Sequence, residues 1–219
     1  MRRVLIACGL LAALLQASAQ AQQSININSE MLAAARRGNA EAVKSLLEQG
    51  ASINSRNRLG DTALLKAAKN SQNSHMSLAI LVLAQGADVN LRNLAGVSPL
   101  MAAAFNGNVE LTRALLERGA DLTPVDRVKK TAALYAAGNG HTEVLRLLLD
   151  RGVPVNQRYD NELTALMWAA AYGHDGTVKL LLERGADPLA RDNRGKTAAD
   201  MAAEGGHRAT LDLLKARAS

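Results

Sequence analysis

The sequence predicts an all-α fold, a solenoid of about six helix–turn–helix repeats joined by extended β-turn fingers. Of the 219 residues, 76 are Ala or Leu, which favour closely packed helices, whereas the β-branched and aromatic residues of sheets are scarce. Hydroxyl residues recur at spacings of 36, 33, 33 and 33, at Thr62, Ser98, Thr131, Thr164 and Thr197. Glycines recur at the same spacings, at Gly50, Gly86, Gly119, Gly152 and Gly185. Two sets of residues sharing one period of this length are typical of a solenoid.

Residues 1–21 have the layout of a secretory signal peptide. Arg2 and Arg3 precede an apolar run over residues 4–15, and small residues at 17, 19 and 21 offer two cleavage sites. A lipoprotein cleavage before Cys8 would leave an apolar region of only four residues, which is shorter than usual. We therefore expect an exported protein, periplasmic or secreted, in which residues 22–28 form a short linker.

One repeat, residues 161–193, shows why each unit predicts two helices. Thr164 can cap a short Ala-rich helix, and Gly173 ends that helix because glycine accepts a positive φ. The second helix has a stripe at the i, i+3, i+4 spacing of a buried face, formed by Val178, Leu181 and Leu182. Neither helix could bury its apolar face alone, so neighbouring repeats have to stack.

The same repeat resembles the ankyrin repeat, whose pattern runs TPLHxAAxxGH…LLLxxGAD. The matching strings are TALMWAA from residue 164, GH from 173, LLL from 180 and GAD from 185. The resemblance covers residues 29–219 and implies stacked helix pairs with protruding turns. We expect units at about 29–58, 59–94, 95–127, 128–160, 161–193 and 194–219.

The sequence departs from the ankyrin pattern at a few places. The Pro of the TPLH string survives only as Pro99. Three extra residues in the second unit fall in a polar stretch around residues 70–75, where we expect a longer loop between the two helices. The last unit stops where its glycine would fall, with Lys215 and Arg217 near that end. This ending predicts a C-terminal cap with a solvated outer face.

Composition excludes several classes of protein. The net charge is +6, which falls to +4 when Arg2 and Arg3 are removed, and basic residues alternate with acidic ones. A nucleic-acid binder concentrates its positive charge, so we expect no nucleic-acid partner. The single cysteine excludes a disulfide scaffold. Beyond residue 15 no apolar stretch approaches the roughly 20 residues that span a bilayer, so we expect no transmembrane segment in the mature chain.

No motif of catalysis or cofactor binding stands out. The sequence lacks the H-E-x-x-H, C-x-x-C, G-x-S-x-G and P-loop strings, so we expect no enzyme, no cofactor and no metal. His141, His174 and His207 recur every 33 residues, which suggests a metal ladder. Equivalent residues in stacked helices lie roughly 8–10 Å apart, too far for two imidazoles to share one zinc at about 2.1 Å each. We expect these histidines to be structural residues of the turns.

All five aromatic residues map to the recognition face that the resemblance implies. In the ankyrin pattern, the positions four, seven and eight residues after the Thr face a concave groove, and the fingers edge it. Four aromatics take these positions and the fifth lies in a finger, while two lysines extend the face towards the N-terminus. The predicted protein-binding residues are Lys66, Lys69, Phe105, Tyr135, Tyr159, Trp168 and Tyr172. Aromatic residues are preferred anchors of interfaces, although these rings could also shield Ala-rich packing.

These features predict a non-catalytic protein–protein interaction module of the cell envelope. We expect a monomer that binds a partner protein through its concave groove. An alternative is an immunity-like inhibitor, or an auxiliary or regulatory factor, for a periplasmic enzyme. A third is attachment to anionic envelope surfaces through Arg127, Lys129 and Lys130.

Overall fold

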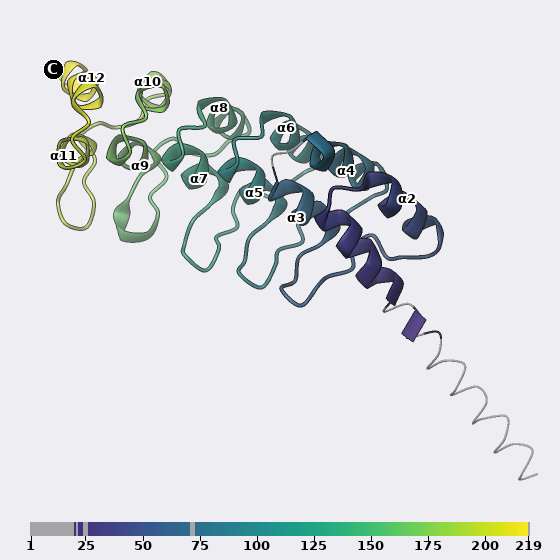
Figure 1. Cartoon of the computed structure of the whole chain (residues 1–219). Coiled ribbons are helices and arrows are strands. Elements are labelled where there is room, and N and C mark those ends of the chain that lie inside the picture. Colours follow the sequence, from purple (N-terminus) through teal and green to yellow (C-terminus); the bar gives the residue numbers. More distant parts are fainter. Residues whose placement is uncertain (1–19, 21, 24–25, 71–72, 219) are drawn as a thin grey trace, which may run out of the picture.

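The computed structural model shows helices stacked in two layers, with extended turns that project from one side of the stack (Figure 1). It describes residues 20, 22–23, 26–70 and 73–218, and within these ranges there is no strand. The all-α solenoid expected from the sequence is confirmed. The signal peptide expected over residues 1–21 lies, apart from residue 20, outside the described residues.

The helices alternate between the two layers. Residues 26–36 are helical and precede α2. One layer contains the first helix of each later pair: α3 (Ala63–Ala68), α5 (Pro99–Phe105), α7 (Ala132–Gly138), α9 (Ala165–Ala171) and α11 (Ala198–Glu204). The other layer contains the second helices: α2 (Ala40–Glu48), α4 (Asn73–Ala84), α6 (Val109–Glu117), α8 (Thr142–Asp150), α10 (Asp175–Glu183) and α12 (Arg208–Ala218). A short 3₁₀ helix, η1 (Asp160–Glu162), lies in the turn before α9.

The periodic hydroxyl residues begin the first helices, as the sequence predicts. Each side-chain oxygen accepts a hydrogen bond from the backbone N–H three residues later, at 3.2–3.3 Å. Such a cap satisfies a backbone N–H that has no partner inside the helix. The five caps are Thr62, Ser98, Thr131, Thr164 and Thr197.

Small and large apolar residues divide the core between the layers. Alanines such as Ala136 and Ala169 are fully buried in the first helices, where α7 contacts both α5 and α9. The absence of large side chains there lets neighbouring helices approach closely. Leu148 of α8 and Leu181 of α10 are also fully buried and fill the space between the layers. The repeats are therefore held by contacts with their neighbours.

The turn histidines tie each repeat to the one before it. Nε2 of His141, His174 and His207 lies 2.9–3.1 Å from the backbone carbonyl oxygen of the residue 36 positions earlier. Each ring also lies against a glycine of the preceding turn: a Cβ at Gly140, whose φ is +72°, would lie 2.6 Å from Nδ1 of His174. These histidines are structural, as expected.

The prediction of a longer loop around residues 70–75 is wrong for residues 73–75. Residues 73–75 belong to α4, which has 12 residues where α6, α8 and α10 have nine. His75 is buried in the first turn of α4, and its Nε2 lies 3.2 Å from the carbonyl oxygen of Arg36. The insertion therefore lengthens the helix, while His75 makes the same kind of bond to the preceding repeat as the turn histidines do.

The C-terminal repeat has the character of a cap. Leu214 of α12 is buried against the array, whereas Lys215 and Arg217 are exposed. Within the described residues, α12 contacts α10 and α11. The exposed charged residues on its other face suit contact with solvent.

Candidate interaction surface

Four of the predicted aromatic residues form a continuous strip across three consecutive first helices. Phe105 of α5 and Tyr135 of α7 meet edge to face, with ring centroids 5.5 Å apart. Trp168 of α9 stacks on Tyr172 at 5.8 Å, and Tyr172 in turn stacks on His174 at 6.3 Å. We call Phe105, Tyr135, Trp168 and Tyr172, together with Lys130, the aromatic strip.

Lys130 joins the two halves of the strip. Its Nζ lies 4.3 Å from the ring centroid of Trp168 and 5.6 Å from that of Tyr135. Both distances are within the range of a cation–π interaction. The strip therefore presents apolar ring surface with a positive charge at its centre.

A buried carboxylate orients Tyr135. The phenol O–H donates to Oδ2 of Asp126, while Oδ1 of Asp126 accepts the backbone N–H groups of Val128 and Lys130 at 3.0 Å. Burial, and then the hydrogen bond with Asp126, raise the pKa of Tyr135 above its usual range. The phenol thus stays protonated, and the same carboxylate fixes both Tyr135 and the backbone of Lys130.

The strip divides into exposed and half-buried rings. The exposed fractions of Phe105 and Tyr172 are 52% and 53%, whereas Tyr135 and Trp168 are half-buried. Trp168 packs where Gly138 of α7 leaves room, since a Cβ there would lie 3.4 Å from the indole ring. The expectation that rings shield the Ala-rich packing therefore fits Tyr135 and Trp168, while Phe105 and Tyr172 are available to a partner.

Trp168 also carries an unpaired donor. Its Nε1 is buried and has no hydrogen-bond partner within the described part of the chain. A buried donor without an acceptor costs about 1–3 kcal/mol.

Lys66 and Lys69 converge on Asp61 and differ in their surroundings. Nζ of Lys69 lies 2.7 Å from Oδ1 of Asp61, and Nζ of Lys66 lies 4.0 Å from Oδ2. Lys69 lines a hollow of about 390 Å³ together with Phe105 and Tyr135. Lys66 instead lines a separate hollow towards the N-terminus. The structure therefore brings Lys69 to the aromatic strip and leaves Lys66 apart from it.

The contribution of Asp61 to the stability of the folded state depends on pH. Burial alone would raise the pKa of Asp61, but hydrogen bonds from Lys69 and Asn93, with the charges of Lys69 and Lys66, outweigh it and lower the pKa below its usual value. The folded state therefore gains stability from the ionised carboxylate above the unfolded pKa of about 3.9. That gain is lost as the pH falls through the folded pKa.

We expect Asp61→Asn to lower the free energy of unfolding at pH 7 by about 1.5 kcal/mol or more, because charged hydrogen bonds are lost. The difference from the wild-type protein should shrink as the pH falls below about 4, where Asp61 of the unfolded wild-type chain takes up a proton, and should vanish below the lowered folded pKa. Urea unfolding at pH 7 and pH 3 measures it, with the exposed Glu117→Gln as control. An equal difference at both pH values would contradict the ionised role of Asp61.

Tyr159 lies apart from the aromatic strip. It lines a different pocket, which contains none of the other predicted protein-binding residues and lies between two fingers. Burial raises the pKa of Tyr159, and a hydrogen bond with the side chain of Thr131 partly offsets this rise. The structure thus divides the seven predicted residues between three places.

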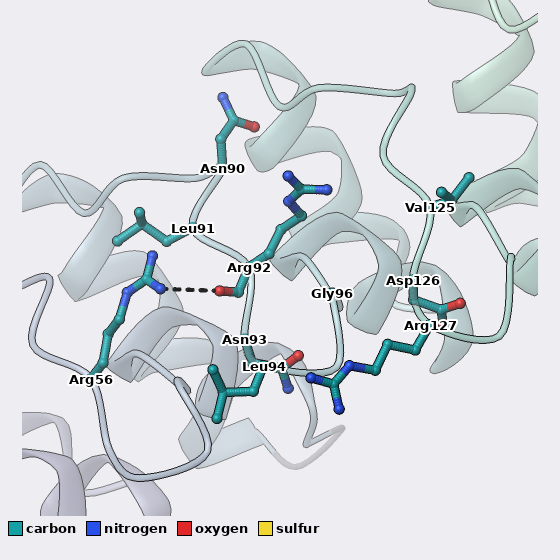
Figure 2. Close-up of a pocket in the computed structure, with 10 residues that line it drawn as sticks. All are labelled: Arg56, Asn90, Leu91, Arg92, Asn93, Leu94, Gly96, Val125, Asp126 and Arg127. Atoms are coloured by element: carbon teal, nitrogen blue, oxygen red, sulfur yellow. Dashed lines mark hydrogen bonds between the residues drawn. The ribbon is translucent and has the colours of Figure 1, made fainter.

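The cations expected to attach the protein to anionic surfaces do not form one cluster. Lys130 lies over the rings of the strip, and Lys129 lines the pocket of Tyr159. Arg127 lines another hollow with Arg56 and Arg92, where Figure 2 shows Arg56 donating to the carbonyl oxygen of Arg92 at 3.3 Å. This separation does not favour a common anionic surface as their ligand.

Two residues of the site, Lys130 and Asp126, were not among the predicted protein-binding residues, although Lys130 was one of the cations expected to meet an anionic surface. Lys130 directly precedes the cap Thr131, so the repeat register places it beside the first helix, but its position between two rings is a tertiary contact. Asp126 has the same register position as Asn57, Asn93 and Asp192, all of which accept backbone N–H groups in their fingers. That recurrence is a signal in the sequence from which the finger carboxylates could have been predicted.

The described residues contain no group of three or more His, Cys, Asp or Glu side chains placed to hold a metal ion. None of the helices in the described ranges has the length and apolar character needed to cross a membrane.

Comparison with known proteins agrees with the geometry. The family model described as ankyrin repeats (3 copies) matches the chain three times, over residues 30–126, 71–159 and 135–219. Together these matches cover residues 30–219, and no catalytic family was found. A search of curated proteins gave no match.

Proposed function

The chain belongs to the ankyrin repeat family, which suggests a protein–protein interaction module, and from this premise we propose that it binds a partner protein in the cell envelope through the aromatic strip. The observation that carries the proposal is the continuity of the strip over α5, α7 and α9. About half of each of the Phe105 and Tyr172 side chains is exposed, so both offer ring surface to a partner.

The chemistry of the strip defines the segment that it would bind. Ring faces and the hollow beside Phe105 offer apolar surface, which suits large apolar side chains of a partner. The charges nearby are that of Lys130 and that of Lys69, which is paired with the buried Asp61, while the buried Asp126 is occupied by internal hydrogen bonds. We therefore propose a partner segment that combines apolar side chains with carboxylates.

Affinity capture from an envelope extract tests this function when it uses matched baits. The Phe105→Ala/Tyr172→Ala variant is compared with the wild-type chain and with Ile80→Ala. Ile80 belongs to α4, in the layer of second helices, and its exposed fraction of 51% nearly equals those of Phe105 and Tyr172. The partner is the protein that mass spectrometry finds with the wild-type and Ile80→Ala baits but not with the strip variant. If all three baits capture the same proteins, the strip is not the binding site.

We further propose that the protein is exported, because of the signal-peptide layout of residues 1–21. Protein recovered from its native host is expected to begin near Gln20 or Gln22 and to lack Cys8. N-terminal sequencing of the periplasmic or secreted form measures the cleavage. A mature chain that starts at Met1, or at a lipidated Cys8, would contradict export by this route.

A further inference from the structure

Consecutive fingers are joined by a backbone hydrogen bond, except at one junction. The fingers of the described chain comprise residues 57–61, 93–97, 126–130, 159–163 and 192–196, each closed by a bond from its first N–H to its last carbonyl. Three of the four junctions have one further bond, from the second residue of a finger to the third residue of the preceding finger. These bonds are Leu94 N–H to Leu59 O, Arg127 N–H to Ala95 O and Asn193 N–H to Asn161 O, at 2.9–3.1 Å. The corresponding bond from Asp160 N–H to Val128 O is absent among the described residues.

A second kind of link is missing at the same junction. At the other junctions, an Asn side chain in the turn after one second helix accepts the backbone N–H of the next turn. Asn54, Asn90 and Asn156 bind Asp88, Asp121 and Asp187 in this way, at 2.9–3.0 Å. At the junction between the fingers of residues 126–130 and 159–163, Thr123 stands at the position of the Asn acceptor and Pro154 at the position of the N–H donor. Pro154 has no N–H to donate, and Thr123 turns back to bond with Asp121 of its own turn.

The finger after this junction also differs in its own structure. In four fingers, the side chain of the first residue accepts two backbone N–H groups of its own finger; these residues are Asn57, Asn93, Asp126 and Asp192. In the finger of residues 159–163, the first residue is Tyr159. Tyrosine has no acceptor that reaches those groups. The finger instead forms η1, with φ of +59° at Asn161 and +61° at Glu162. Three sequence changes therefore remove bonds that recur at the other junctions and fingers of the described chain.

A pocket of about 540 Å³ lies at this junction, within the roughly 300–1,000 Å³ typical of ligand sites. Its apolar wall includes Leu122, Val125, Ala133, Val153 and Pro154. Residues 123 and 154, where the side-chain link between the turns is missing, both line it, as does Tyr159, whose finger lacks the internal side-chain bonds. The same changes that omit the links between the repeats thus leave the space open.

The pocket also presents backbone groups that the other junctions use internally. Asp160 N–H has no hydrogen bond within the described residues, although its counterparts at the other junctions donate to the preceding finger. Gly152 lines the pocket, and no hydrogen bond within the described ranges reaches its carbonyl oxygen or that of Gly86, whereas the carbonyls of Gly119 and Gly185 accept from Asn90 and Asn156. An unpaired donor and an unpaired acceptor beside an apolar wall match the backbone of an extended peptide.

We propose that this pocket binds an extended peptide segment of a partner protein, which inserts a large apolar side chain and carries a carboxylate. The inference rests on the proposed function, since it assigns a second contact for a protein partner. The backbone of the segment pairs with Asp160 N–H and Gly152 O in place of the missing links. The carboxylate faces Lys129, which lines the pocket and forms no ion pair within the described chain, whereas Arg158 is paired with Glu162 at 3.3 Å.

Phage display of random 12-residue peptides on the full mature chain tests the proposal. The counter-selection uses a repaired variant, Thr123→Asn/Pro154→Asp/Tyr159→Asp, which restores the residue types of the intact junctions. Leu189→Asn is the matched control, because it introduces Asn at the same register of another junction, outside the pocket. Lys129→Glu, an exposed change, tests the charge without depending on the repaired fold.

We expect the wild-type chain and Leu189→Asn to enrich peptides in which a large apolar residue is close to Asp or Glu. The repaired variant should melt at a higher temperature and bind these peptides about tenfold or more weakly, and Lys129→Glu should weaken them too. Hydrogen exchange of the Asp160 amide should slow when a selected peptide binds. Equal binding by the repaired variant, no enrichment on the wild-type chain, or unchanged exchange at Asp160 would overturn the proposal. Because this selection detects only the pocket, loss of partner capture by the strip variant tests the proposed function separately.

Discussion

Replacing Leu148 or Leu181 by Ala is expected to lower the free energy of unfolding by about 2–5 kcal/mol, the range for a buried leucine whose removal leaves a cavity. Both side chains are fully buried, in α8 and α10. Each of these helices has a neighbour on both sides, since α8 contacts α6 and α10, and α10 contacts α8 and α12. A cavity there therefore weakens the junctions on both sides of the repeat.

Leu214 is the control for this prediction. It is as well buried, with 1% of its surface exposed, but within the described residues α12 contacts one other second helix, α10, where α8 and α10 each contact two. Leu214→Ala should therefore destabilise the protein less than either inner change. Urea unfolding of the three variants measures their free energies of unfolding. A larger decrease for Leu214→Ala than for the inner leucines would contradict the idea that contacts on both sides of a repeat stabilise the core.

Phe105→Ala and Tyr172→Ala together are expected to weaken partner binding by about 2 kcal/mol or more, which is roughly thirtyfold. The reason is that both rings expose about half of their surface on one continuous strip. The melting temperature should change little, because exposed positions contribute little to stability. Titration of the captured partner, with thermal unfolding of the same samples, measures both quantities.

Two comparisons separate an interface from rings that only shield the helices. Trp168→Ala should lower both affinity and melting temperature, because its half-buried ring packs against α7 at Gly138. Ile80→Ala should change neither by much. If the Phe105/Tyr172 double variant loses affinity only in proportion to its loss of stability, the shielding interpretation is correct and the interface is not.

The repeating parts of the fold could be predicted from the sequence because each is a local rule applied many times. Thr164 caps α9 because its side chain reaches an N–H three residues away, which depends on no other repeat. Gly173 ends its helix at a φ of +70° for an equally local reason. Such features are determined by short spacing, so the period revealed both the helices and their order.

The insertion could not be predicted in the same way, because its outcome depends on a contact between repeats. Polar residues around position 70 suit a loop as well as a helix terminus. The bond of His75 to the carbonyl of Arg36, which accompanies the longer α4, joins residues 39 positions apart. A local sequence pattern carries no information about contacts between residues so far apart in the sequence.

The candidate site shows a similar division. The register placed Phe105, Tyr135, Trp168 and Tyr172 on one face, and the structure brings them into contact there. The cation at the centre of the strip, and the separation of Tyr159 from it, depend on how turns lie against neighbouring helices. The altered junction at Tyr159 was visible in the sequence as a change from Asn or Asp, yet its consequence required the pocket to be seen.

Site-specific photo-crosslinking in the native host tests the central claim most directly. A photoreactive phenylalanine derivative is placed at position 105, at position 172 and, as the matched control, at position 80, whose exposed fraction is nearly the same. Binding through the aromatic strip predicts one shared adduct from positions 105 and 172 and none from position 80. Adducts from position 80 alone, or the same adduct in equal yield from all three positions, would contradict it.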